Sequence, residues 1–462
     1  MQRVLSIALL TWKAALRFRL FLVISSLLLA TVVLLPMLIK DDGTARGFTQ
    51  ILLTYTLGII ATLLGLSTLW LACGTLARDI EECQIQMIAT KPVARWQIWV
   101  GKWVGLMTLN AALLVISGSS VYLLLQWRAT RLPAAEQAIL RNEVLVSRGS
   151  ARERSFDKEI NEQTEKLLIE RVQKYPADRV DMVEVRKQIR EQVKAELQVV
   201  PPGAFRPWEI NLGAAAAHLK DQPLYVRVKF NSAQKSVSGT FDALWQFGLP
   251  QKTQMYRAGP MSLAPDTFHE FQIPPNLIDE NGVLTFAFIN SNDATLLFPL
   301  EDGMEILYRE GGFLMNYVRG LGIIFCWMAL LCAIGLASAS LLSFPVAAFF
   351  SLSLLAISLS TGTISNAVTQ GTIADYDSEK GTSGSSPADV IVIPMFKATL
   401  KLVNMVKEFS PVEALSTGRS ITWGDLGRAF AQIVLGMGGT FALGGILILN
   451  RRLLKRFWIT SG

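Results

Sequence analysis

The chain has 462 residues, of which 51% are hydrophobic and 18% are charged, and its formal net charge is +7. This composition excludes an ordinary soluble enzyme and indicates a protein that crosses a membrane several times. All cysteines fall in or beside hydrophobic stretches, so no disulfide framework is expected, which fits a bacterial inner membrane. They are Cys73, Cys83, Cys326 and Cys332.

The first residues predict an amphipathic helix that lies on the membrane surface. Apolar residues recur with helical spacing over residues 1–16, and Lys13, Arg17 and Arg19 separate this stretch from a long apolar run. No small-residue cleavage site follows a short apolar core. We therefore expect a retained surface helix that leads into the first span.

Six apolar runs are each long enough to cross a bilayer. Basic residues lie before the first run, in the short loop after the second and beyond the sixth, which predicts that these regions are cytoplasmic. We therefore expect a multi-pass protein of the bacterial inner (cytoplasmic) membrane with both termini in the cytoplasm. The runs have almost no ionisable side chains, which argues against a proton- or sodium-coupled carrier. They are residues 20–38, 51–77, 103–125, 320–341, 342–361 and 429–449.

The loop after the second run, residues 78–102, is the stretch on which the functional argument depends. Its first half combines a loose apolar stripe with acidic residues, which predicts a helix that ends at Pro92. A second short segment then begins with Trp96 and Trp99, aromatic residues typical of a membrane interface. We interpret the loop as a folded cytoplasmic hairpin, and a plain basic loop with ordinary anchors is the simpler alternative.

The same loop carries a resemblance to a known family. Its acidic helix, the Lys-Pro-Val-Ala-Arg turn at 91–95 and the Gly-Lys pair at 101–102 resemble the first cytoplasmic loop of type-2 ABC exporter permeases. The nearest branch contains permeases of nitrous-oxide-reductase maturation and of gliding motility. The resemblance implies a coupling helix that docks on a separate ATPase subunit, which would hold ATP and Mg²⁺, and a second permease copy or paralogue. It assigns this coupling to Glu81, Glu82, Gln86, Lys91, Pro92, Arg95 and Lys102, with Arg95 and Lys102 facing lipid headgroups or partner acids.

The polar block at 126–313 is expected to form an extracytoplasmic α+β domain. Charged helical sequence over 134–199 predicts a helical arm, and short alternating segments over 204–310 predict a β-sandwich. Residues 268–290 are similar to jelly-roll modules of the carbohydrate-binding kind, which implies a periplasmic protein or a glycan as ligand. The candidate ligand surface comprises Trp208, Trp245, Tyr256 and His269. The simpler and favoured interpretation is that these are core and rim residues of a small sandwich.

The predicted fold class is a membrane all-α protein with six transmembrane helices and this inserted domain. Residues 1–125 hold the surface helix and the first three spans, and residues 314–462 hold the last three. Between the fifth and sixth spans, apolar residues alternate with lysines over 390–409, which predicts an amphipathic helix at the outer interface.

No catalytic or cofactor pattern is found in the chain. His218 and His269 are far apart with no cysteine nearby, so no zinc site is predicted, and no phosphate-binding loop is present. Acidic and basic residues alternate, which argues against a nucleic-acid partner. The chain is therefore expected to be a permease that moves substrate or force by means of ATP hydrolysed elsewhere. The alternatives are a non-transporting mechanotransmitter that couples a cytoplasmic ATPase to a periplasmic partner and, third, a membrane hydrolase.

Overall fold

The computed structural model describes residues 2–38, 44–82, 93–174, 182–232, 234, 236, 238–250, 252–359, 376–377, 382–383 and 389–460. Two compact units form within the chain. The helical unit comprises residues 1–147 and 311–462, and the inserted unit comprises residues 148–310. The insertion is therefore shorter than the expected 126–313, because the chain on both sides of it packs with the helices.

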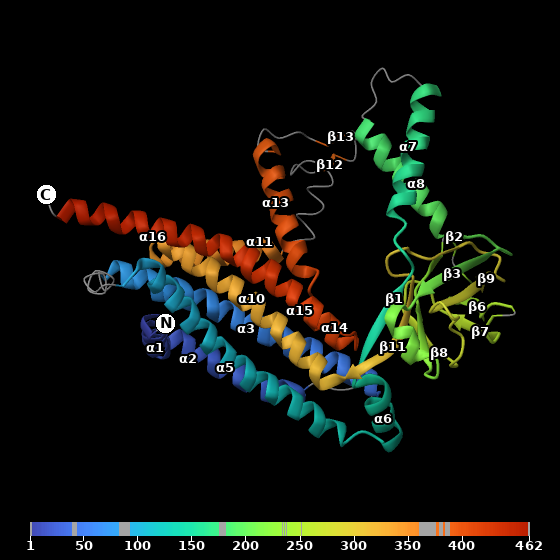
Figure 1. The fold of residues 1–462 in the computed structure, drawn as a ribbon, viewed down its shortest axis with the longest axis horizontal. Helices are drawn as coiled ribbons and strands as arrows, with labels where there is room; N and C mark the ends of the chain where they lie inside the picture. Colours follow the sequence, from blue (N-terminus) through green and yellow to red (C-terminus); the bar gives the residue numbers. More distant parts are fainter. Residues whose placement is uncertain are drawn as a thin grey trace. The chain divides into compact units, whose positions relative to one another are not determined.

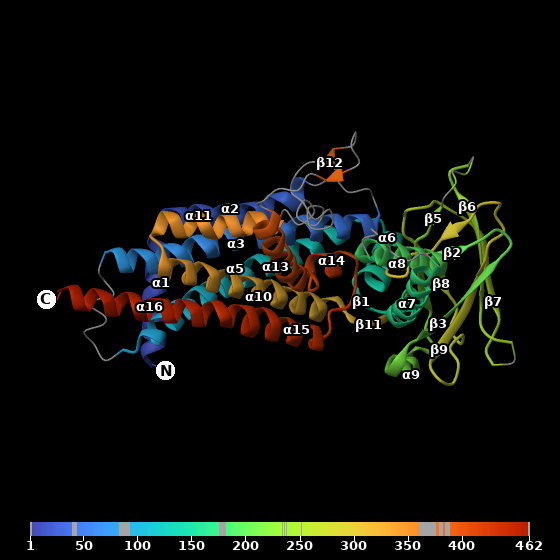
Figure 2. The same cartoon turned by 90° about the horizontal axis from the view of Figure 1, so that it is seen from above.

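The helical unit is built from long apolar helices that run side by side (Figures 1 and 2). Within the described residues, five of them are long and apolar enough to cross a membrane, which agrees with a membrane protein. They are α2 (Arg19–Leu38), α3 (Ala45–Glu81), α5 (Arg95–Ala129), α10 (Phe313–Leu341) and the Trp423–Arg451 stretch of α15 (Trp423–Ala429), η3 (Phe430–Gly438) and α16 (Gly439–Thr460).

The sixth expected span is not confirmed. The apolar run at 342–361 forms α11 (Phe344–Leu359), which has 16 residues. At about 1.5 Å per residue the described part of this helix is roughly 24 Å long, below the ~30 Å thickness of the hydrocarbon core. The helix starts late because Leu342 is in an extended conformation that ends α10.

Helix α1 (Gln2–Arg17) runs across the bundle instead of along it, as Figure 2 shows. It packs on α5 at two glycines, where the backbones approach closely. A Cβ atom added at Gly101 would lie 2.8 Å from Ile7 Cβ, and one added at Gly105 would lie 2.8 Å from the Ala8 carbonyl oxygen. Small residues at such positions are a common means of packing helices in a membrane protein.

The remaining elements of the helical unit are one helix of 19 residues and several short segments. The expected amphipathic helix at 390–409 is present as α13 (Asp389–Lys407). Asn316 of α10 fixes the chain between α14 and α15, because its amide donates to Arg419 O at 2.7 Å and accepts from Ile421 N at 2.7 Å. The others are α6 (Ala134–Ile139), η1 (Leu140–Val144), β12 (Tyr376–Asp377), β13 (Thr382–Ser383) and α14 (Pro411–Ser416).

The inserted unit contains two four-stranded sheets that share one hydrophobic core, as the alternating segments predicted. One has the strand order β1-β11-β4-β8, and the other has the order β3-β9-β6-β7. A short third sheet has the order β2-β10-β5. The strands are β1 (Val146–Arg152), β2 (Val199–Val200), β3 (Phe205–Asn211), β4 (Leu224–Val228), β5 (Asn231–Ser232), β6 (Phe241–Phe247), β7 (Tyr256–Leu263), β8 (His269–Ile273), β9 (Val283–Ile289), β10 (Leu296–Leu297) and β11 (Met304–Gly312), with the short helices η2 (Gly213–Ala215) and α9 (Ala216–Leu219).

The helical arm expected at 134–199 is only partly correct. Helices α7 (Asp157–Lys174) and α8 (Met182–Gln198) pair through a small apolar cluster that includes Ile160 and Ile189. Ahead of them, β1 is a strand of the sandwich, hydrogen-bonded beside β11. Its sequence, VSRGSAR, has little apolar character, so its strand conformation comes from pairing with a distant part of the chain.

Replacement of Gly105 by valine should displace α1 from α5. The new side chain would overlap the backbone of Ala8, and overpacking of this kind costs about 1–3 kcal/mol. The matched control is Gly58→Val on α3, where an added Cβ has open space around it. Thermal unfolding in detergent should show a lower midpoint for Gly105→Val only, and equal midpoints for the two variants would contradict this packing.

Candidate functional site

The candidate site is the junction, defined here as the end of α3, the start of α5 and the side chains that contact them. Helix α3 continues without a break to Glu81, and Glu82 follows as its C-cap residue. The first part of the expected hairpin is therefore the last turn of a 37-residue helix. Of the residues assigned to coupling, Gln86, Lys91 and Pro92 lie outside the described residues.

A buried ion pair connects the two helices of the junction. Lys102 Nζ lies 2.5 Å from Asp79 Oδ2 and donates a hydrogen bond to the Thr75 carbonyl oxygen at 2.9 Å. The Lys102 side chain is 7% exposed and that of Asp79 is 24% exposed. This contact differs from the expectation that Lys102 faces lipid headgroups or a partner, because its charge is already compensated inside the chain.

A second set of contacts connects the end of α3 to α11 and to the link between α1 and α2. The Arg78 guanidinium lies 4.7 Å from the ring centroid of Phe18 and 5.0 Å from that of Phe344, within cation–π range. Both rings pack against Gly74, which leaves room for them. Glu81 accepts a hydrogen bond from the Phe344 backbone N–H at 2.8 Å, so it caps the first turn of α11.

The start of α5 contacts the last helix. Arg95 donates to the carbonyl oxygen of Asn450, within α16, at 3.0 Å. Trp99 is buried against Gly445, so it is a packing residue and not the interfacial anchor that was expected. Trp96 is 50% exposed and remains available for that role.

The junction thus gathers four helices and the Phe18 link at one end of the bundle. Figures 1 and 2 show α1 and the end of α16 toward this same end, whereas α5 ends and α10 begins at the opposite one. The sequence identified the segment but missed the partners Arg78, Asp79 and Phe344. A usable signal was present, because a lysine that opens a long apolar helix needs a counter-charge.

The second candidate, the aromatic ligand surface, is wrong for its two tryptophans. Trp208 is 1% exposed and Trp245 is 0% exposed, and they lie with ring centroids 5.8 Å apart in the shared core. Tyr256 is partly buried beside Phe247. Successive side chains of a strand point to opposite faces of the sheet. The alternation in the sequence therefore predicted the strands correctly but did not tell which of the two faces, and so which aromatic residues, the opposite sheet would bury.

His269 is also engaged within its own loop. Its Nε2 lies 2.9 Å from Thr267 Oγ1 and 2.7 Å from the Ala264 carbonyl oxygen. Among the described residues, no group of three or more His, Cys, Asp or Glu side chains is placed to hold a metal ion.

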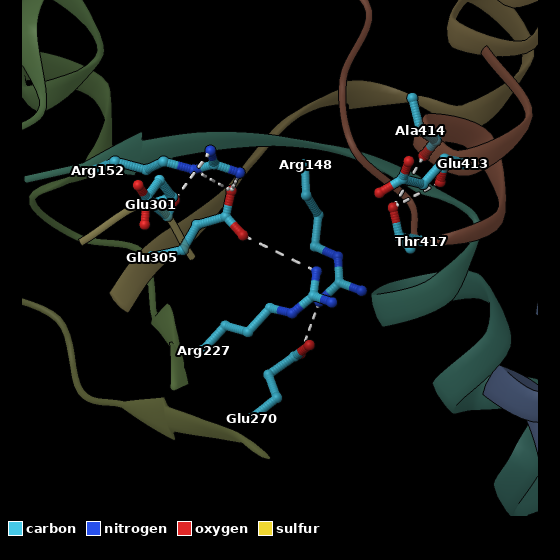
Figure 3. A network of polar contacts seen from close by, with 9 residues as sticks. All are labelled: Arg148, Arg152, Arg227, Glu270, Glu301, Glu305, Glu413, Ala414 and Thr417. Atoms are coloured by element: carbon cyan, nitrogen blue, oxygen red, sulfur yellow. Dashed lines mark hydrogen bonds and ion pairs between the residues drawn. The ribbon is translucent and has the colours of Figure 1, made fainter. Parts of the chain in front are cut away.

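Charged side chains of the inserted unit pair with one another across the sheet β1-β11-β4-β8 (Figure 3). Arg148 lies 2.6 Å from Glu270, and Glu305 accepts from Arg152 at 3.2 Å and lies 3.9 Å from Arg227. Glu305 of β11 thus pairs with arginines of both neighbouring strands, a cross-strand arrangement that stabilises a sheet, whereas Arg148 of β1 reaches across to Glu270 of the outer strand β8. These charges are engaged within the unit, so the network is structural. In the helical unit, the same figure shows Thr417 donating to the Glu413 carbonyl oxygen at 2.8 Å, a local contact at the end of α14.

A further ion pair of the inserted unit is mostly shielded from water. Burial raises the pKa of the Glu153 carboxyl above its ordinary value, while Arg206 at 3.2 Å acts in the opposite direction. The same burial lowers the pKa of Arg206. This pair lies beside Trp208, whose ring the Arg206 guanidinium covers at 4.7 Å, so it belongs to the packing of the core.

No family model, curated protein or solved structure matches this chain. Its function is therefore inferred from the contacts of the junction.

Removal of either partner of the buried ion pair should destabilise the helical unit, and removal of the acid should destabilise it more than removal of the lysine. Asp79→Asn leaves the buried ammonium of Lys102 without its counter-charge, which costs about 3–5 kcal/mol. Lys102→Met should cost less, since the more exposed Asp79 can regain water. Thermal unfolding in detergent should rank the variants in this order, with the double variant more stable than Asp79→Asn alone. Lys13→Met, at an exposed position of α1, is the control.

Substitutions on strand β3 should show whether Trp208 is a core residue of the inserted unit or part of its surface. Trp208→Ala removes a fully buried ring and should cost about 3–5 kcal/mol. Phe205→Ala on the same strand is the control, because that ring is 70% exposed. Urea-dependent proteolysis of the full-length protein, with fragments of residues 148–310 identified by mass spectrometry, reports the difference. Equal resistance of the two variants to proteolysis would contradict the burial of Trp208 in the core.

Proposed function

We propose that the chain is the membrane-spanning permease subunit of an ABC transporter, driven by ATP that a separate subunit hydrolyses. The observation that supports this most is the junction, where one buried ion pair, one cation–π cluster and one helix cap connect the loop region 78–102 to four helices. A displacement applied to this loop would be passed to these helices through those contacts. That is the property a coupling segment requires.

The partner surface is inferred from what the junction leaves exposed. Glu82 and Trp96 are exposed at the two ends of the segment, whereas Lys102 and Trp99 are buried. We infer that the ATPase contacts the segment through Glu82, and that a second permease copy or a paralogue completes the transporter. ATP and Mg²⁺ would be bound by the ATPase subunit alone.

Reversal of the Glu82 charge should weaken this docking. Full-length tagged protein, purified in mild detergent from the membranes of its source cell, should bring with it a Mg²⁺-dependent ATPase activity. Glu82→Lys should lower the copurified activity about tenfold, which corresponds to ~1.4 kcal/mol of contact energy. Glu81 is less suitable for this test, because its charge reversal would also remove the cap of α11.

The control is Glu170→Lys, the same charge reversal on an exposed position of α7. It should leave the copurified activity unchanged. Wild-type protein without any ATPase activity would contradict the proposal, and equal activity in Glu82→Lys would remove this acid from the interface.

A second candidate function, mechanotransmission to an external protein, is favoured by one observation. The inserted unit has its own core, distinct from that of the helical unit, and so has the build of a module that could carry a partner. A transporter and a mechanotransmitter share the same ATPase coupling. They differ in whether any solute crosses the bilayer when reconstituted vesicles hydrolyse ATP.

A further inference from the structure

An apolar groove of about 610 Å³ runs between α5 and α10. Both helices are long enough to cross a membrane, so the groove lies between two spans. Its floor is buried and includes Leu114 and Tyr317, whereas its walls are exposed, with Val115 at 63% and Leu123 at 66%. The groove therefore opens sideways along its length.

Two hydroxyl groups in this groove have no hydrogen-bond partner among the described residues, namely those of Ser119 and Tyr122. Their neighbours behave differently. Ser117 and Ser120 donate to backbone carbonyl oxygens one turn earlier, at 2.8 Å each, and Tyr317 donates to the Gly118 carbonyl oxygen at 2.9 Å. Ser119 and Tyr122 are three residues apart, so they lie on one face of α5.

Unpaired hydroxyl groups are costly next to hydrocarbon, so an acceptor inside the groove would be stabilising. The groove lining contains no charged residue, so the carboxylate of a free fatty acid would find no counter-charge there. A helix of a second copy would offer few acceptors, because its backbone carbonyl groups are already bonded within the helix. An ester carbonyl attached to a hydrocarbon chain satisfies both requirements.

We propose that this groove binds one acyl chain of a phospholipid, whose ester carbonyl accepts hydrogen bonds from Ser119 and Tyr122. The chain extends along α5 and α10 toward Ala111 and Phe325, the lining residues farthest from the two hydroxyl groups along each helix. The bound lipid would fill a hollow between two helices that Tyr317 holds together at the floor. This inference does not depend on the function proposed above.

The first test locates the chain. Full-length protein is placed in phosphatidylcholine vesicles that contain a small fraction of phosphatidylcholine with a photoactivatable diazirine at the chain end. Mass spectrometry should find the label concentrated near Ala111 and Phe325. Ala111→Trp should reduce that label to the level of the other lipid-facing helices, whereas Leu34→Trp on exposed α2 should not.

The second test addresses the carbonyl group and does not require a bulky substitution. Wild-type protein should take up the ester-linked probe in several-fold preference to an ether-linked probe that lacks the carbonyl. The double variant Ser119→Ala with Tyr122→Phe should lose this preference and keep its fold, since neither hydroxyl bonds to the described protein.

Two results would overturn the proposal. One is label spread evenly over α2 and the groove, with no preference between ester and ether. The other is efficient disulfide cross-linking of two copies through Val115→Cys in the same vesicles, which would assign the groove to a second copy of the chain.

Discussion

The arrangement of the helical unit depends on the compensation of one buried ammonium group. Lys102 opens a long apolar helix and has almost no access to water, so an unpaired charge there would cost several kcal/mol. Asp79 and the Thr75 carbonyl oxygen remove that cost, and in doing so they fix the rotation of α3 against α5. A second contact confirms the same antiparallel register further along both helices. Asn110 donates to Thr68 Oγ1 at 2.9 Å. Asn110 follows Lys102 by eight residues on α5, and Thr68 precedes Thr75 by seven residues on α3, as expected for two antiparallel helices.

Close packing extends this constraint from the pair to its neighbours. Lys102 lies between Gly101 and Gly105, the two positions where α1 contacts the α5 backbone. Helix α3 also approaches α10 closely, because a Cβ added at Gly335 of α10 would lie 2.7 Å from the Cβ of Ala72. Helices in lipid gain little from the hydrophobic effect between them, so such contacts at small residues supply much of their association. The ion pair sets the register of α3 against α5, and the small residues allow the neighbouring helices to pack closely around that pair.

The sequence was informative where one property of a segment determines its state. Long apolar runs predicted six spans, and five helices among the described residues are long and apolar enough to cross a membrane. A change of period near residue 200 predicted the sheets, because length and alternation are local signals. It was uninformative where the partner is distant. The strand conformation of Val146–Arg152 depends on its pairing with β11, and the burial of Trp245 depends on which face of its sheet the opposite sheet covers. The pairing of Asp79 with Lys102 likewise arises across a loop, and no periodicity within either helix reports it.

The magnitudes at the junction favour joint movement of α3 and α5, should a partner displace the loop. Separation of α3 from α5 would expose Lys102 to an apolar surrounding without its counter-charge, at a cost of several kcal/mol. Loss of the Arg78 contacts with Phe18 and Phe344 would cost less, about 0.5–2 kcal/mol each, since cation–π contacts are weaker. The weaker connection is thus the one to α11 and the α1–α2 link. A force at the loop would therefore tilt α3 and α5 together, and the hinge would lie where these aromatic rings meet the guanidinium of Arg78.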